Sequence, residues 1–151
     1  MKIELKEVQE CELMEYANIV LTLCKEHFGL REKIGYSDYN NEKENYNCYN
    51  ILGNYKEKGT HFYFITLDNE KVGTIASYEQ NSEVNDEPII YIDSFYILPE
   101  HRNKGIGRKT IEILKEMIAP KKIELHCLYG NESEIFYDKI GAKKVKIVYS
   151  I

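Results

Sequence analysis

The sequence lacks several features that would place it outside the cytoplasm. No apolar run reaches the roughly 18 residues expected of a membrane-spanning helix. The 151 residues also include no tryptophan and only three prolines, which say nothing about location. Residues 1–7 mix charged and apolar side chains, unlike a secretory signal peptide. We therefore expect a cytoplasmic protein without membrane contact. The widely spaced cysteines, with no CxxC pair, predict reduced thiols and no metal site: Cys11, Cys24, Cys48 and Cys127.

A surplus of positive charge is also missing. The 20 lysines and arginines face 25 aspartates and glutamates, for a net charge of −5. Because phosphate binding depends on basic side chains, this balance disfavours nucleic acid as a partner and mildly favours a cationic one. No repeat or linker interrupts the chain, and its length suits one domain over residues 1–151.

The hydrophobic pattern predicts an α/β fold of the α+β kind, with a mixed sheet flanked by helices. Strands are expected where apolar residues alternate or run continuously, at residues 2–8, 60–67, 71–80, 89–98, 122–129 and 143–151. Helices are expected where apolar residues follow helical spacing, at residues 10–28 with Gly29 as the stop, at residues 105–119 before Pro120, and in a short stretch that begins near residues 131–134 and ends near Gly141. Residues 31–59, rich in tyrosine, are expected to form a loop with one irregular helix.

The most informative segment joins the apolar strand at 89–98 to the helix at 105–119. Its sequence is Phe-Tyr-Ile-Leu-Pro-Glu-His-Arg-Asn-Lys-Gly-Ile-Gly-Arg over residues 95–108. The first N–H groups of a helix have no internal partner and lie at its positive end, so they attract anions. Gly105 and Gly107 allow phosphate oxygens to approach the backbone, and Arg102, Lys104 and Arg108 add positive charge. The segment therefore predicts an anion-binding cradle.

Two common phosphate loops do not fit this segment. A dinucleotide fingerprint needs a third glycine where Thr110 stands. A P-loop needs its first glycine where Arg102 stands and its lysine directly after the second glycine, but here Arg108 separates Gly107 from the lysine. The pattern Arg102-x-x-Gly105-x-Gly107 instead resembles the pyrophosphate-binding signature of the GNAT superfamily of N-acetyltransferases. The strand before it and the elements after it, including Phe136-Tyr137, extend the resemblance over most of residues 60–145. The alternative is a surface turn with a solvated basic patch.

The resemblance implies a central, mostly antiparallel sheet splayed between residues 89–98 and 122–129, with acetyl-CoA as co-substrate. The pantetheine arm would pair with backbone groups of residues 95–97, and a backbone N–H near Ile97 would stabilise the oxyanion. Residues 102–108 would hold the pyrophosphate. Asn131 could also contact the coenzyme, although helix capping explains it equally well. The implied coenzyme contacts are Phe95, Tyr96, Ile97, Arg102, Asn103, Lys104, Gly105, Ile106, Gly107, Arg108 and Asn131.

The implied chemistry is direct attack of a neutral amine on a thioester. Because an amine is protonated near pH 7, a base or a water chain must remove its proton, and an acid must protonate the thiolate that leaves. Tyr137 is the candidate acid, with plain packing as the alternative. Asp93, the one carboxylate inside the apolar strand, is the candidate base because burial raises a carboxyl pKa. A hydrogen-bonded structural role for Asp93 is the alternative.

Residues 90–97 resemble the same strand of diamine and polyamine acetyltransferases, in which an acid stands at the position of Asp93. That subgroup often carries a second acid at the next position, where this chain has Ser94. The expected acceptor is therefore the primary amine of a small molecule: a polyamine, an amino sugar, an aminoglycoside or an amino acid. A protein N-terminus or lysine as the acceptor, or a non-catalytic acyl-CoA-binding module, are the alternatives. A homodimer is expected by resemblance only.

Overall fold

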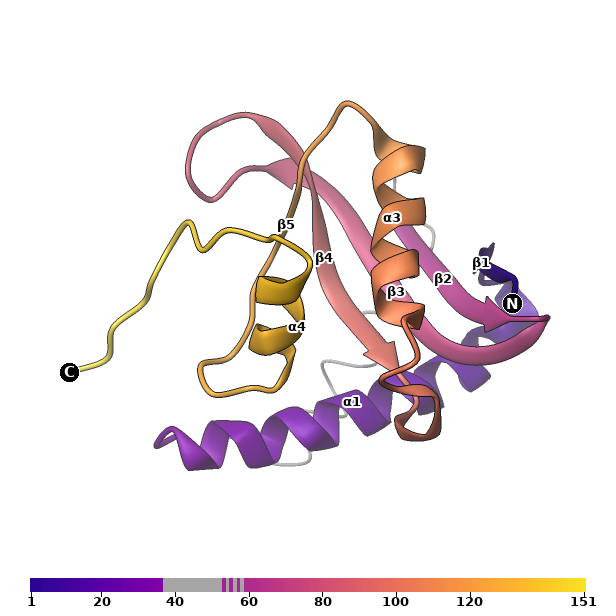
Figure 1. The fold of residues 1–151 in the computed structure, drawn as a ribbon, viewed down its shortest axis with the longest axis horizontal. Coiled ribbons are helices and arrows are strands. Elements are labelled where there is room, and N and C mark those ends of the chain that lie inside the picture. The colour runs from indigo at the N-terminus through magenta and orange to yellow at the C-terminus, as the bar shows by residue number, and fades with distance from the viewer. Residues whose placement is uncertain (37–52, 54, 56, 58) are drawn as a thin grey trace.

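The apolar runs of the sequence form one mixed sheet in the computed structural model, which describes residues 1–36, 53, 55, 57 and 59–151 (Figure 1). Within these residues the sheet has the order β1-β2-β3-β4-β5. Neighbouring strands are antiparallel except β4 and β5, which are parallel. This confirms the predicted mixed, mostly antiparallel sheet. The strands are β1 (Ile3–Glu7), β2 (Thr60–Leu67), β3 (Glu70–Asn81), β4 (Pro88–Ile97) and β5 (Ile123–Leu125).

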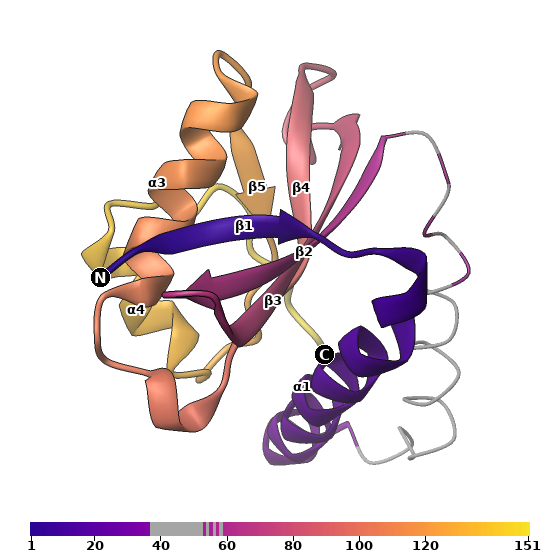
Figure 2. The same ribbon diagram turned by 90° about the vertical axis from the view of Figure 1, so that its right-hand side faces the viewer.

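The helices cover the two faces of the sheet. The chain crosses one face as α1 (Leu13–Lys33), which follows a 3-10 turn, η1 (Glu10–Glu12). The other face carries α3 (Ile106–Ile118) and α4 (Ser133–Lys139) (Figure 2). A second 3-10 turn, η2 (Pro99–His101), joins β4 to the loop before α3. The sheet therefore lies between two helical layers.

Each face of the sheet has its own apolar core. On the α1 face, Tyr16 stacks on Phe62 with ring centroids 5.1 Å apart, and Phe64 packs beside them. On the α3 face, Ile75 and Leu114 belong to a second cluster that includes side chains of α4. Burying one such side chain contributes about 1.5–3 kcal/mol. The two cores thus hold β3 and β4 rigidly between the helices.

The predicted end of the first helix is wrong. Gly29 lies inside α1, where a glycine costs only about 1 kcal/mol relative to alanine. The helix instead ends beyond Lys33, where Gly35 takes a positive φ of 94°. The Gly35 N–H donates to the Glu32 carbonyl and the Tyr36 N–H donates to the Arg31 carbonyl, so the turn satisfies the last carbonyls of the helix. Most of the predicted loop and irregular helix at residues 31–59 lies outside the described residues.

Two predictions for the C-terminal part are also wrong. The strand expected at residues 122–129 is limited to β5, and the strand expected at residues 143–151 does not form. Val145, Ile147 and Tyr149 alternate as in a strand, yet all three are exposed. A strand needs a hydrogen-bonded neighbour, and no described strand pairs with this segment, which leads away from the body of the fold past α4 (Figure 1). Among the described residues, no helix is long and apolar enough to cross a bilayer.

Candidate active site

Strands β4 and β5 separate beyond a short stretch of pairing. Their pairs run only from Ile90 opposite Ile123 to Ile92 opposite Leu125. Residues 94–97 of β4 pair with β3 alone. The backbone of β4 therefore has an open edge toward the end of β5, at the position that sequence reasoning predicts for the splay and for the contacts of Phe95, Tyr96 and Ile97.

A β-bulge lies at Asp93. Across β3 and β4, Ala76 pairs with Ser94 and Ser77 pairs with Ile92, so Asp93 is the extra residue. Ile92 and Phe95 both pack in the core under α3, although residues three apart on a regular strand would face opposite sides. The bulge thus turns Asp93 toward the α1 face while the flanking apolar residues stay in the core.

The loop after β4 presents a row of unpaired main-chain N–H groups. The His101 and Arg102 N–H groups donate to carbonyls inside the η2 turn. For residues 103–108, no acceptor occurs in the described part of the chain. Asn103 and Gly105 have positive φ angles of 60° and 80°, which curve the loop, and α3 begins directly afterwards. A run of unpaired amides at a helix N-terminus has the donors and the positive potential that an anion needs.

Gly105 and Gly107, the two glycines of this cradle, have different structural roles. Gly105 precedes α3 in the left-handed conformation, and a Cβ there would meet no atom within 4 Å. A Cβ on Gly107 would lie only 3.2 Å from the Phe136 ring. Gly105 therefore serves the turn and leaves the space in front of the loop open, while its contact with phosphate stays a prediction. Gly107 lets α3 pack against Phe136, and this packing is a role that sequence reasoning missed.

The basic side chains of the cradle contact carbonyl groups. The Nζ of Lys104 donates to the Glu100 carbonyl at 2.8 Å, and the guanidinium of Arg108 donates to the Lys139 carbonyl at 3.2 Å. Neither Lys104 nor Arg108 forms an ion pair within the described residues. Their charges therefore add to the positive potential around the free amides.

Arg102 joins the cradle to α1. Its Nε donates to the Ile97 carbonyl at 2.8 Å, and its guanidinium lies 3.3 Å from a carboxylate oxygen of Glu26. The Tyr96 hydroxyl donates to the same carboxylate at 3.0 Å. Burial, with a contribution from Glu26, raises the pKa of Tyr96 to about 12. The side chain of Arg102 thus braces the loop, and Glu26 is a further residue of the site.

Tyr137 lies on α4, on the same face of the sheet as α3. Its ring meets Phe136 edge-on with centroids 5.1 Å apart, and Phe136 meets Phe95 of β4 in the same manner at 6.1 Å. Burial raises the pKa of the Tyr137 phenol well above its usual value. The phenol therefore carries its proton at neutral pH, as a general acid must.

Polar side chains gather around Asp93 on the α1 face. The Asp93 side chain is exposed on this face, but the phenols around it partly desolvate the carboxyl and raise its pKa, a shift that the Tyr78 hydroxyl at 3.5 Å partly offsets. Tyr91 lies directly opposite Tyr78 across β3 and β4, and its hydroxyl is 2.9 Å from Nδ1 of His126. This group, named here the acceptor face, offers a carboxylate and phenols where a cationic amine could bind.

A model of the acetyltransferase (GNAT) family matches residues 20–142, which is most of the chain. The chain belongs to the GNAT family. It is an acetyl-CoA-dependent N-acetyltransferase, and the resemblance seen in the sequence is confirmed.

Individual relatives agree with this family. The D-amino-acid N-acetyltransferase HPA3 of Saccharomyces cerevisiae is 28% identical over 67 residues, which are 42% of this chain and 42% of that protein. The chain thus spans less than half of this curated relative. Among solved structures, YycN from Bacillus subtilis has a TM-score of 0.74 at 18% identity, covering 99% of this chain and 98% of that one. The aminoglycoside N-acetyltransferase AAC(6')-Iy in complex with CoA has a TM-score of 0.67 at 10% identity, covering 99% and 93%.

The other predicted residues of this GNAT chain have structural partners. Oδ1 of Asn131 accepts the Ser133 N–H at 3.1 Å, so Asn131 caps the start of α4; its contact with the coenzyme stays a prediction. Ser94 is buried against α1, and its hydroxyl has no partner among the described residues. No group of His, Cys, Asp and Glu in the described residues could hold a metal ion.

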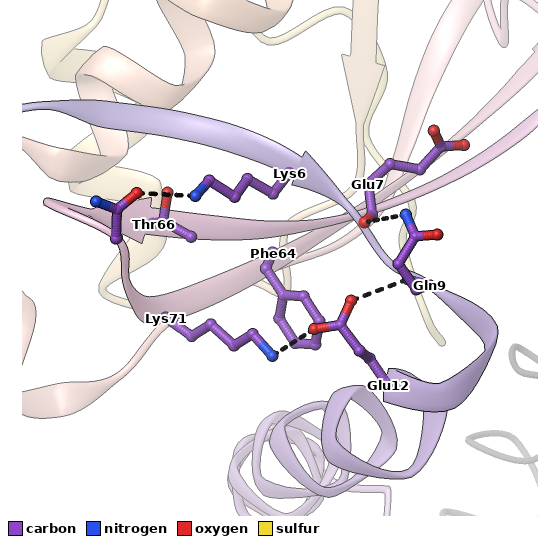
Figure 3. A pocket seen from close by; sticks show the side chains of 8 residues that line it. Lys6, Glu7, Gln9, Glu12, Phe64, Thr66 and Lys71 are labelled. Carbon is purple, nitrogen blue, oxygen red and sulfur yellow. Dashed lines mark hydrogen bonds and ion pairs between the residues drawn. The ribbon is translucent and has the colours of Figure 1, made fainter.

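A separate groove of about 500 Å³ lies at the β1 edge of the sheet, the edge opposite β5 (Figure 3). Two of its charged groups pair with each other: Nζ of Lys71 is 2.6 Å from a carboxylate oxygen of Glu12. The same nitrogen is 2.6 Å from Glu15 and lies over the Phe64 ring. Hydrogen bonding to Lys71 lowers the pKa of Glu12. This groove is part of the structure that joins α1 to the sheet.

Proposed function

We propose that this chain transfers the acetyl group of acetyl-CoA to a primary amine of a small cationic molecule. The observation that carries the proposal is the row of free amides at residues 103–108, placed at the end of a strand with an open edge. A diphosphate matches those donors, and the open edge of β4 offers backbone groups beside them. The neighbouring acceptor face supplies a carboxylate for an ammonium group.

The residues of the cradle fit the coenzyme. The amides of residues 103–108 would hold the pyrophosphate, with Lys104 and Arg108 supplying charge from either side. The space in front of Gly105 is free of side chains. When bound, acetyl-CoA supplies an activated acetyl thioester, and the backbone of residues 95–97 is the nearest part of β4 to receive its arm.

Tyr137 is the proposed general acid. Its phenol keeps its proton because burial raises its pKa, and it has no hydrogen-bond partner among the described residues. The Tyr137 ring packs on Phe136, which packs on Phe95 of β4, so the phenol is held beside the strand that would receive the arm of the coenzyme. The proton that it holds is available to the sulfur that leaves.

Asp93 is the proposed contact for the ammonium group of the acceptor. The bulge directs its carboxylate to the face opposite α3, and Tyr78 lies beside it. The raised pKa makes the carboxylate a better proton acceptor than an ordinary aspartate. Polyamines, amino sugars, aminoglycosides and amino acids share the charge that this face would recognise, and D-amino-acid and aminoglycoside acetyltransferases are among the relatives.

A coupled binding and turnover experiment tests the proposal. Calorimetry with CoA should give one site per chain, and thiol release from acetyl-CoA should depend on one member of a panel of spermidine, glucosamine, kanamycin, lysine and a short peptide. Absence of CoA binding would overturn the proposal. CoA binding with turnover on the peptide alone would favour a protein acceptor, and binding without any turnover would favour an acyl-CoA-binding module. The cytoplasmic location and the homodimer stay predictions.

A further inference from the structure

A second hydrogen-bonded group leads from the acceptor face to solvent. The Tyr91 hydroxyl lies 2.9 Å from Nδ1 of His126, and Nε2 of His126 lies 3.8 Å from a carboxylate oxygen of Glu83. Tyr91 belongs to β4, His126 follows β5, and Glu83 lies in the loop between β3 and β4. Tyr91 is half-buried, whereas the His126 side chain is 65% exposed. The group therefore runs from a half-buried phenol to an exposed imidazole in contact with water.

The Tyr91 end of this group lies on the same face of the sheet as Asp93. Tyr91 is paired with Tyr78 across the two strands, and the Tyr78 hydroxyl is 3.5 Å from the Asp93 carboxylate. Burial, followed by the charge of Asp93, raises the pKa of both phenols. Both therefore keep their protons near neutral pH, and the Tyr91 hydroxyl donates to Nδ1 of His126 when the imidazole carries its proton on Nε2. An amine held by Asp93 lies on the face that carries the oxygen of Tyr91.

We infer that Tyr91 and His126 form a proton relay that removes the ammonium proton of the acceptor before it attacks. This inference rests on the proposed function. In the relay, the substrate N–H bond breaks as an O–H bond forms on Tyr91, while the original O–H bond of Tyr91 breaks and an N–H bond forms at Nδ1 of His126. The Glu83 carboxylate stabilises the resulting imidazolium. The exposed ring then releases a proton from Nε2 to water and exchanges its remaining proton with solvent before the next turnover.

Proton affinity favours this route over transfer to Asp93 alone. An imidazole is intrinsically more basic than a carboxylate, so transfer of the ammonium proton to an imidazole is the less uphill step, and the raised pKa of Asp93 narrows that difference. The other charged groups around His126 are consistent with this role. Lys146 pairs with the second oxygen of Glu83 at 3.1 Å. Glu124 of β5 accepts hydrogen bonds from the Ser82 hydroxyl and the Glu83 N–H.

The pH dependence of kcat/KM for His126→Asn tests the relay, with acetyl-CoA and the best amine of the panel. We expect kcat to fall about 10- to 100-fold at pH 7 with little change in KM, and the acid limb to move to lower pH as Asp93 becomes the remaining acceptor. Tyr91→Phe should give a similar loss, and the double variant should be no slower, because both changes break one path. Imidazole in the buffer should partly restore a His126→Gly variant. His61→Asn, an exposed histidine on β2, is the matched control.

The imidazole itself provides a readout that needs no acceptor. In nitrogen-15 NMR spectra, neutral His126 should favour the tautomer protonated at Nε2, and Tyr91→Phe should reduce that preference. An unchanged tautomer ratio in Tyr91→Phe, or an unchanged pH profile in an active His126→Asn enzyme, would overturn the relay. If the unaltered chain released no thiol with any amine, the proposed function would be wrong. The NMR result would still decide whether Tyr91 and His126 form a hydrogen-bonded pair.

Discussion

The cradle follows the end of β4, the acceptor face lies around Asp93 within β4, and the two regions are formed by different chemical groups. Main-chain amides of residues 103–108 form the cradle, and Asn103 and Gly105 shape it through positive φ angles. The acceptor face depends on side chains that come from separate strands, above all Asp93, Tyr78 and Tyr91. In the proposed function, coenzyme binding would thus depend on backbone shape, whereas recognition of the amine would depend on a few replaceable side chains.

The largest expected effect comes from Tyr137→Phe, which would separate chemistry from coenzyme binding. Without the phenolic proton, kcat should fall about 100- to 1000-fold, within the range for loss of a general acid. CoA affinity should not change, because the cradle is untouched. Stopped-flow thiol release and calorimetry measure the two quantities. Tyr129→Phe is the matched control, since Tyr129 is 81% exposed. A Tyr137→Phe enzyme with full kcat would leave Tyr137 as a packing residue.

The next largest effect concerns the acceptor face. Asp93→Asn should lower kcat/KM for a cationic amine about 10- to 100-fold, because the contact for the ammonium group is lost. It should leave CoA affinity unchanged. Asp86→Asn, at an exposed position in the loop after β3, is the control. If Asp93→Asn weakened CoA binding as strongly as turnover, the two regions would not be separable as described here.

Asp93→Asn should also change stability in a pH-dependent way. The folded carboxyl has a raised pKa, so the folded state binds its proton more tightly than the unfolded chain. Ionised Asp93 therefore costs stability at neutral pH, and this cost disappears as the pH falls toward the ordinary value of 3.8. The variant should be more stable than the unaltered chain at pH 7, with the difference shrinking in acid. Urea denaturation across this pH range measures it, and an equal or lower stability at pH 7 would contradict it.

The same contrast explains what could be predicted from the sequence. The shape of the cradle was predictable because its causes are local in the sequence: Gly105 favours a positive φ angle, and the amphipathic pattern after it marks the start of a helix. Asp93 stood out as a carboxylate in an apolar strand. The link from Tyr91 to His126 was not predictable, since it joins residues 35 positions apart through the register of β4 with β5.

Local patterns also failed where tertiary contacts decide the outcome. Residues 143–151 have strand-like alternation, but alternation cannot supply a partner strand, and Val145 and Ile147 are exposed. Gly29 has the composition of a helix stop, but the turn of Gly35 ends α1 instead. The bulge at Asp93 depends on the pairing with β3, so the face on which this side chain lies could not be read from the sequence.

A smaller effect is expected from Gly105→Ala in the cradle. A left-handed conformation costs a residue with a Cβ about 1–2 kcal/mol, so the loop should relax and CoA affinity should fall about 10-fold. Gly35→Ala is the matched control, because Gly35 also has a positive φ and open space around it but ends α1. Both variants should lose similar stability in urea. If both also lost the same CoA affinity, the loss would be general and would not report on the cradle.

The smallest expected effect, from Glu26→Gln, tests whether the two regions are coupled. Glu26 lies on α1, the helix of the acceptor face, yet it holds Arg102 and Tyr96 next to the cradle. An exposed ion pair contributes about 0.2–1 kcal/mol, so CoA affinity measured by calorimetry should weaken by a few-fold at most, and less at high salt. Glu32→Gln on the same helix is the control. Tighter CoA binding by Glu26→Gln would mean that Glu26 holds the Arg102 guanidinium away from the phosphates. In that case α1 would weaken coenzyme binding, whereas the contacts of Arg102 predict that α1 strengthens it.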